Sequence, residues 1–349
     1  MTAVRFDTVS IVFGDDPESA LALMDEGKSR EDILQATGQI LGVHDCELTV
    51  EEGEILVLMG LSGSGKSTLL RAVNGLNPVV RGSVMVKSDG DMVDVTKASP
   101  RALRRLRLNS VAMVFQQFGL LPWRSVRENV GLGLELGGLP ARKRRERVKA
   151  QLALVGLLER ADAKVGELSG GMQQRVGLAR AFATHARILL MDEPFSALDP
   201  LIRTRLQDEL LDLQARMERT IIFVSHDLDE AFKLGDRIAI MEGGRIVQCG
   251  TPREIFSAPA TPYVAEFVEH MNPLGVLCAR DVMVPARAAQ HTATVPLDAL
   301  ITTVMDRLTE EPLVGVTENG TVVGEITRDA VLAKLIDPRA PVEEDAADA

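Results

Sequence analysis

Apolar residues recur along the chain in short runs that alternate with longer stretches of helical periodicity. Residues 4–13 begin with alternating apolar and polar positions, which predicts a strand. Later short runs are almost wholly apolar, as in the strands of a buried parallel sheet, and they cover residues 54–59, 188–191, 220–224 and 237–241. Leucines at helical spacing fill residues 125–180, which we expect to be mostly helical. Strands that alternate with helices predict an α/β fold with a parallel sheet covered on both faces.

A helical insertion is expected at residues 15–41, after the first strand. Within it, Ser29 and Asp32 have the spacing of a capping box, in which side chains and backbone N–H groups bond reciprocally at the start of a helix. Gly38 can end that helix, because glycine adopts the left-handed conformation at no steric cost.

Prolines between positions 252 and 273 mark a boundary between two domains. We expect a first domain at residues 1–270 and a second, small α/β domain at residues 276–336. A chain of 349 residues is long enough to give each domain its own core. Residues 337–349 are acidic, which predicts a disordered tail.

Composition and charge narrow the classes of function. The net charge is −11, which argues against a nucleic-acid partner; the short basic cluster at residues 142–147 is interpreted as a solvated helix face. Cys46, Cys249 and Cys278 lack the spacing of a zinc site or a disulfide framework, which fits a reducing cytoplasm. The sequence shows neither a signal peptide nor an apolar run long enough to cross a bilayer, so any membrane role must come through a partner.

A phosphate-binding loop is predicted between the strand at 54–59 and the helix that follows it. The pattern G-x-x-x-x-G-K-[ST] is formed by Gly60, Leu61, Ser62, Gly63, Ser64, Gly65, Lys66, Ser67 and Thr68. Backbone N–H groups of this loop would wrap the phosphates, and Lys66 would neutralise charge on the β- and γ-phosphates. The hydroxyl of Ser67 would ligate Mg²⁺, so the pattern predicts ATP and Mg²⁺ as cofactors.

Two carboxylates follow the apolar run at 188–191. Asp192 would hold the Mg²⁺ shell through water, and Glu193 would act as the general base toward the attacking water. The run 220–224 leads in the same way to His226, which could reach a γ-phosphate and sense its presence.

A second anion-binding turn is predicted far from the first. Ser169, Gly170 and Gly171 open a helix, where free N–H groups and the positive end of the helix dipole favour an anion. Two phosphate grips for one nucleotide make sense if each nucleotide is held between two copies of the chain. We therefore expect a homodimer.

These motifs occur in the order seen in the ATPases of ATP-binding cassette (ABC) transporters, and the resemblance covers about residues 1–270. It implies a RecA-like parallel-sheet core, an antiparallel β subdomain and a helical signature subdomain at about 125–180. It also implies that Gln116, or its neighbour Gln117, contacts water and Mg²⁺, and that Ser169, Gly170 and Gly171 contact ATP bound to the other subunit. Asp199 would run along the dimer seam. Phe13 stands where the family more often has a tyrosine that stacks on adenine, a change that stacking tolerates.

The insertion, the phosphate loop and residues 118–126 resemble those of quaternary-amine importers, which carry glycine betaine, proline betaine, choline or carnitine. The resemblance implies a peripheral ATPase on the cytoplasmic face of the inner membrane. Its partners would be integral-membrane permease subunits and, indirectly, a periplasmic or extracellular substrate-binding protein. Two alternatives remain open: an importer of another solute, such as a sulfonate, nitrate or a polyamine, and a cassette ATPase outside transport.

The unit at 276–336 resembles a single CBS domain, a module that usually occurs in pairs and binds adenosine nucleotides or senses ionic strength. The acid expected three residues beyond Thr327 is Ala330 here, and Asp329 falls one position short. A structural or dimerisation role for this unit therefore stands beside nucleotide sensing.

Overall fold

The computed structural model describes residues 1–184, 186–269, 271–287 and 291–337. The expected acidic tail lies outside these residues, apart from Asp337. Contacts divide the chain into two units, one of residues 1–227 and 234–249 and another of residues 228–233 and 250–349. In the part of the chain that is described, no helix has the length and apolar character needed to cross a bilayer. The domain limits expected at 270 and 276 stay a prediction.

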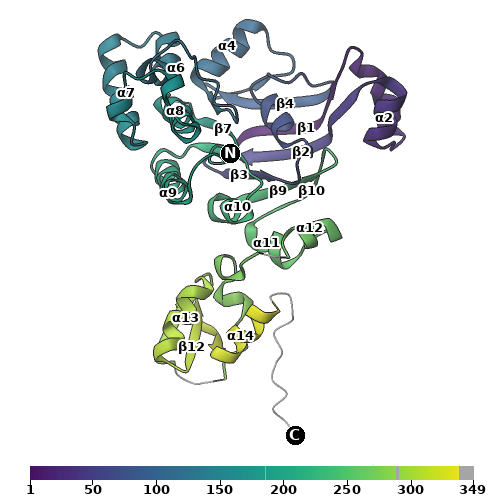
Figure 1. Ribbon diagram of the computed structural model, residues 1–349. Helices are drawn as coiled ribbons and strands as arrows, with labels where there is room; N and C mark the ends of the chain where they lie inside the picture. Colours follow the sequence, from purple (N-terminus) through teal and green to yellow (C-terminus); the bar gives the residue numbers. More distant parts are fainter. Residues whose placement is uncertain (185, 270, 288–290, 338–349) are drawn as a thin grey trace. The chain divides into compact units, whose positions relative to one another are not determined.

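The core of the first unit is a sheet whose strands are arranged in the order β10-β9-β3-β8-β7-β6 (Figure 1). Its strands are β3 (Ile55–Met59), β6 (Val111–Val114), β7 (Ile188–Asp192), β8 (Thr220–Val224), β9 (Arg237–Glu242) and β10 (Arg245–Gly250). The strands from β9 through β3, β8 and β7 to β6 pair in parallel. Every residue of β3, β7 and β8 is buried, which explains why their sequences are apolar without alternation.

A second sheet in this unit is antiparallel, with strands in the order β2-β1-β4-β5. Its strands are β1 (Thr2–Phe13), β2 (Ile40–Glu51), β4 (Arg81–Ser88) and β5 (Asp91–Asp94). Apolar side chains from this sheet and from the parallel sheet share one core, to which Phe6, Val43, Leu58 and Leu190 belong.

The insertion between β1 and β2 contains η1 (Pro17–Ala20), α1 (Leu21–Asp25) and α2 (Arg30–Thr37). Ser29 and Asp32 form the predicted capping box at the start of α2. Gly38 ends this helix with a φ of 71°, also as predicted. The expected limit at residue 41 was wrong, because Ile40 and Leu41 already belong to β2, where burial alternates with the pleat.

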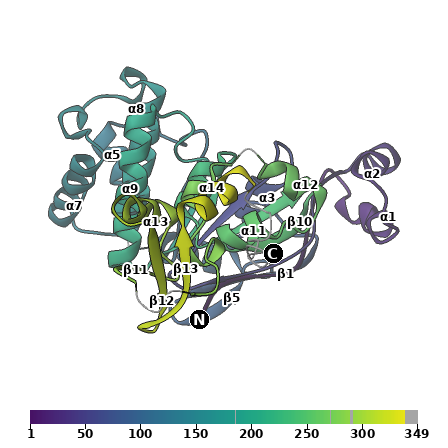
Figure 2. The ribbon, with the colours of Figure 1, turned by 90° about the horizontal axis from the view of Figure 1, so that it is seen from below.

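Helices cover the parallel sheet and extend from it as a separate helical layer. They are α3 (Lys66–Ala72), α4 (Pro100–Asn109), α5 (Val126–Val130), α6 (Leu132–Leu136), α7 (Ala141–Leu154), η2 (Leu158–Arg160), η3 (Val165–Glu167), α8 (Gly170–Ala183) and α9 (Pro200–Met217). Helix α10 (Leu228–Leu234) comes next in the chain, and its residues 228–233 belong to the second unit. The mostly helical character expected of residues 125–180 is confirmed. In both views α7 and α8 lie at the opposite end of the first unit from α2 (Figures 1 and 2), and Figure 2 shows α5 beside them.

The second unit contains a small sheet, β11 (Ala293–Pro296), β12 (Leu313–Glu318) and β13 (Thr321–Thr327), in which β11 and β12 are parallel and β12 and β13 antiparallel. Its helices are α11 (Pro252–Ser257), α12 (Pro262–Phe267), η4 (Pro273–Gly275), η5 (Ala279–Asp281), α13 (Ile301–Glu310) and α14 (Arg328–Ile336). Thr327 caps α14 by accepting a hydrogen bond from the N–H of Ala330. This arrangement is compatible with a CBS-like unit but does not establish one.

Candidate functional site

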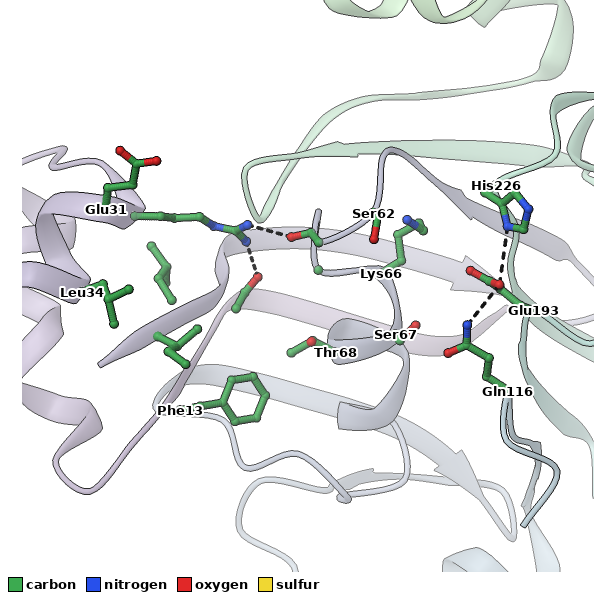
Figure 3. A pocket seen from close by; sticks show the side chains of 16 residues that line it. Phe13, Glu31, Leu34, Ser62, Lys66, Ser67, Thr68, Gln116, Glu193 and His226 are labelled. Atoms are coloured by element: carbon green, nitrogen blue, oxygen red, sulfur yellow. Dashed lines mark hydrogen bonds and ion pairs between the residues drawn. The ribbon is translucent and has the colours of Figure 1, made fainter. Parts of the chain in front are cut away.

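The carboxyl ends of adjacent parallel strands bring the phosphate loop, Gln116, Glu193 and His226 to one edge of the sheet, where ligands bind in open α/β folds. They border a cavity of about 710 Å³. Among the predicted residues, the cavity is lined by Phe13, Ser62, Gly63, Gly65, Lys66, Ser67, Thr68, Gln116, Glu193 and His226. Figure 3 shows Phe13 at one end, Gln116, Glu193 and His226 at the other, and Lys66 and Ser67 between them. Gly60, Leu61 and Ser64 belong to the same loop without lining the cavity.

The phosphate loop folds around its own lysine. The ammonium of Lys66 donates to the carbonyl oxygens of Gly60 and Leu61 at 2.7 and 2.9 Å. Burial lowers the pKa of Lys66, and the nearby carboxylates of Glu193 and Asp192 oppose that shift. Gly65 has a φ of 102°, and a Cβ there would lie 2.6 Å from a backbone oxygen of β2. A side chain at that position is therefore excluded on two grounds.

Asp192 lies beneath the loop and is completely buried. The hydroxyl of Ser67 donates to its Oδ1 at 2.6 Å, and the guanidinium of Arg71 donates to its Oδ2 at 2.7 Å. The arginine charge offsets the cost of burying the carboxylate, and the two bonds fix its orientation. A hydroxyl and a carboxylate oxygen are hard donors that suit Mg²⁺.

Glu193 is held in a conformation that few residues other than glycine adopt, with a φ of 48°. Its N–H donates to the carbonyl of Val224, and its side chain points into the cavity. Gln116 Nε2 donates to Glu193 Oε2 at 3.2 Å, and His226 Nδ1 lies 3.5 Å from the same oxygen. His226 is 64% exposed and Glu193 is 19% exposed, so both can meet a ligand. Of the two adjacent glutamines, only Gln116 lines this cavity.

The predicted second grip lies apart from this cavity. Ser169 caps α8, and neither it nor the two glycines that follow belong to the cavity lining. A Cβ on Gly171 would lie 3.1 Å from the carbonyl oxygen of Ala197, so the start of α8 touches the segment that follows Glu193. Asp199 caps α9 at the end of that segment and is also outside the lining.

Two arginines at the site were missed by the sequence reasoning. Arg71 follows Ser67 by four positions on α3, a spacing that puts both side chains on one helix face toward Asp192 and could have revealed it. Arg30 donates to the carbonyl of Gly63 across 33 positions of sequence, and no local pattern signals a contact of that kind.

The comparisons with known proteins agree with this geometry. A family model described as ABC transporter matches residues 43–196. The glycine betaine/proline betaine transport system ATP-binding protein ProV of Salmonella typhimurium is 52% identical over 78% of this chain and 67% of its own length. The chain belongs to the ABC transporter family. It is an ATPase subunit of that family, and the predicted family and the P-loop ABC ATPase fold are confirmed.

One further relative and one solved structure also resemble this ABC transporter subunit. The trimethylamine N-oxide transport system ATP-binding protein TmoW of Ruegeria pomeroyi is 44% identical over 93% of this chain and 94% of its own length. A dimeric ATP-binding cassette in a post-hydrolysis state, bound to ADP and Pi, matches with a TM-score of 0.62 and 29% identity. It covers 72% of this chain and 99% of its own. Binding of a nucleotide is thereby supported as a property of the cassette.

Proposed function

We propose that the chain binds Mg-ATP in the cavity at the edge of the parallel sheet and hydrolyses it with Glu193 as general base. The observation that carries this proposal is the convergence of Gln116 and His226 on one oxygen of Glu193, in the cavity that Lys66 also lines. The carboxylate takes the proton of the attacking water, and Lys66 neutralises the phosphates. Gln116 orients the water, and His226 contacts the γ-phosphate.

Mg²⁺ fits the donors that the chain offers. Ser67 and Asp192 are the ligands we propose, Asp192 acting through water, together with Gln116, which lines the same cavity as Ser67. The described residues contain no cluster of three or more acidic, histidine or cysteine side chains able to hold a metal by themselves. That agrees with a cation held by few protein donors together with phosphate oxygens. When bound, Mg²⁺ supplies positive charge to the transferring phosphoryl group.

Replacing the proposed base tests this assignment. We expect Glu193→Gln to bind ATP with native affinity and to lose at least about a hundredfold in hydrolysis, because the amide cannot accept the proton. Single-turnover hydrolysis and equilibrium ATP binding measure the two effects separately. Full turnover by this variant would remove Glu193 from the role of base.

We propose further that two copies complete each site, with Ser169, Gly170, Gly171 and Asp199 serving the partner's nucleotide. The position of these residues outside this copy's own cavity supports that arrangement. The dimeric cassette that matches this fold supports it too.

The solute we propose is a small methylated amine: glycine betaine, proline betaine or choline. The identity to ProV supports this class, as does 47% identity to the glycine betaine/carnitine transport ATP-binding protein GbuA of Listeria monocytogenes. Trimethylamine N-oxide is a second candidate, because TmoW matches this chain over nearly the full length of both proteins. The polyamine alternative is less favoured, because its relative is less similar to this chain than ProV is. The spermidine/putrescine import protein PotA of Acidothermus cellulolyticus is 41% identical over 75% of the chain.

Coupling to separate membrane permease subunits, at the cytoplasmic face of the membrane, completes the proposal. A groove of about 460 Å³ runs between the loop after β6 and the helical layer. It is lined by Leu108, Phe115, Leu132 and Leu136, among other residues. An apolar groove beside the Gln116 loop suits a permease segment whose movement must reach the site. A substrate-binding protein would act only through the permease.

Uptake experiments separate the candidate solutes. A deletion strain should lose uptake of labelled betaine or choline, or of trimethylamine N-oxide if the second candidate is right. Glu193→Gln should fail to restore that uptake, whereas the native chain should succeed. Unchanged uptake of all these solutes in the deletion strain would contradict the proposed class.

A further inference from the structure

Two apolar side chains of the insertion region are exposed at the nucleotide cavity. Leu34 on α2 is 47% exposed and Ile40 at the start of β2 is 58% exposed, and both line the cavity that contains Lys66. Leu34 lies with Phe13 at the end farthest from Glu193 (Figure 3). Phe13 and Ile40 are direct partners in the antiparallel pairing of β1 and β2, so their side chains share one face. The exposed apolar surface therefore gathers where a base would lie when the phosphates are at Lys66.

Neither side chain belongs to the core of the insertion. A small core holds the insertion against the antiparallel sheet, and it is formed by Val12, Ala20, Met24, Ile33 and Leu41. Ile33 is completely buried in this core, whereas Leu34, one position along the helix, turns to the cavity. A ligand in the cavity would shield Leu34 and Ile40 from water, and such burial is favourable.

Helix α2 is also tied to the phosphate loop. Arg30, its first residue, donates from Nη1 to the carbonyl of Gly63 at 2.8 Å and from Nη2 to the carbonyl of Gly42 at 2.6 Å. The guanidinium packs against Gly244, where a Cβ would lie 2.5 Å from Nη2. Burial lowers the pKa of Arg30. One planar fork thus bridges β2 and the loop, a geometry that a lysine cannot reproduce.

Gly42, whose carbonyl accepts from Arg30, also makes room for the ring of Phe13. A Cβ on Gly42 would lie 2.9 Å from the ring of Phe13 and 3.1 Å from the methyl group of Thr68. The absence of a side chain at Gly42 lets the ring lie beside Thr68 on the phosphate loop. Ring, loop and insertion helix therefore meet at one short stretch of β2.

We propose that helix α2 is the base-side wall of the nucleotide site. Leu34 and Ile40 pack against a purine base beside Phe13, and Arg30 is a positioning residue that holds the phosphate loop through Gly63. Leucine and isoleucine offer no hydrogen bond, so they stabilise adenine and guanine nucleotides alike. This inference rests on the proposed phosphate grip of Lys66, and it gives the insertion a role in nucleotide binding.

Steady-state hydrolysis by the full chain, with tripolyphosphate as a competitor that lacks a base, tests the proposal. We expect Leu34→Ala and Ile40→Ala each to raise KM for ATP and GTP by about three- to tenfold, from lost apolar contact. We expect kcat to change by less than about twofold, because the contact is uniform in ground and transition states. The inhibition constant of tripolyphosphate should stay unchanged. Arg30→Met should instead weaken ATP and tripolyphosphate in the same proportion.

Gln35→Ala is the matched control, since Gln35 is exposed on the same helix and does not line the cavity. It should leave every constant unchanged. The proposal is overturned if Leu34→Ala and Ile40→Ala leave KM unchanged, or if they weaken tripolyphosphate as much as ATP. Lys66→Ala tests the proposed phosphate site separately from the base-side wall. If tripolyphosphate still binds to this variant, the proposed phosphate site is wrong. Should Arg30→Met fail to fold, the Leu34 and Ile40 variants decide the question alone.

Discussion

At the scale of single residues, the site depends on buried charges that are matched by specific partners. Asp192 is completely buried, and its carboxylate is matched by the guanidinium of Arg71. Removing one partner of a buried pair leaves the other charge without compensation, which costs more than the pair itself contributes. Arg71 therefore orients Asp192 for the proposed cation and also stabilises the fold.

We predict that Arg71→Met lowers the free energy of unfolding by about 2 to 3 kcal/mol, because Asp192 is left as an unpaired buried charge. The matched control is Arg105→Met, which breaks an ion pair to Asp89 whose two side chains are 70% and 50% exposed. Such a pair contributes at most about 1 kcal/mol. Denaturant unfolding of the two variants measures both values. Equal losses would show that the Arg71–Asp192 pair has no special weight.

Cys46 makes stability depend on alkaline pH. Its thiol donates to the carbonyl of Gly244, and burial raises its pKa from 9.0 to about 11. Between these values the unfolded chain loses the proton and the folded chain keeps it, so the stability contribution present below pH 9 is lost as pH rises toward 11. Lys66 has the opposite sign, because its lowered pKa makes stability rise with pH in its own range.

We predict that native stability falls by about 2 kcal/mol more than that of Cys46→Ala between about pH 8.5 and 10.5. Urea unfolding at the two pH values gives the difference. The contribution of Lys66 to the pH dependence cancels, because both proteins contain this residue. Parallel pH profiles for the two proteins would show that the thiol does not carry the effect.

At the scale of elements, helix α8 connects the loops around Glu193 and Gln116. Near its start, Gln174 donates to the carbonyl of Glu193 and accepts from the N–H of Ala197. Near its end, Arg180 donates to the carbonyls of Phe118 and Gly119 at 2.9 and 2.6 Å. Helix α8 holds both loops and so fixes the distance between Glu193 and Gln116. A shift of the helix would move both loops.

We predict that Arg180→Met lowers kcat by about tenfold and changes KM for ATP by less than about twofold, because the charged hydrogen bonds that hold the loop after Gln116 are lost. Phe118 and Gly119 both have positive φ, and such backbone depends on its surroundings to persist. Steady-state kinetics with a circular-dichroism check of folding measures the effect. A variant with altered KM and native kcat would argue for a role in binding instead.

The most buried strands and the helical layer were predictable from the sequence, whereas β4, β5, β6 and β10 were not identified. Buried strands such as β7 and β8 are recognisable by their apolar sequences. The capping box of Ser29 and Asp32 predicted the start of α2. Strand β2 was hidden, because the start of its alternating pattern was assigned to the insertion. At the site, the loop and the strand-end residues followed from spacing, whereas Arg30 acts on a carbonyl 33 positions away. Contacts of that kind arise from packing and leave no trace in local sequence.

At the scale of the whole molecule, we propose that two copies of the chain are needed to complete each nucleotide site. Ser169 caps α8 outside the cavity, which is why we propose that it contacts the nucleotide of a second copy. In the proposed dimer each copy carries a net charge of −11, so the contacts that both copies make to the shared nucleotide must outweigh charge repulsion. We propose that formation of the dimer with nucleotide moves the permease.

Light scattering of Glu193→Gln, with and without Mg-ATP, tests this central claim most directly. We predict the mass of a monomer without nucleotide and of a dimer at saturating Mg-ATP, because the variant binds without hydrolysing. Adding Ser169→Arg to the same chain should keep it monomeric while ATP binding persists. A monomeric mass for Glu193→Gln at saturating Mg-ATP, or a dimer that Ser169→Arg leaves intact, would contradict the shared site.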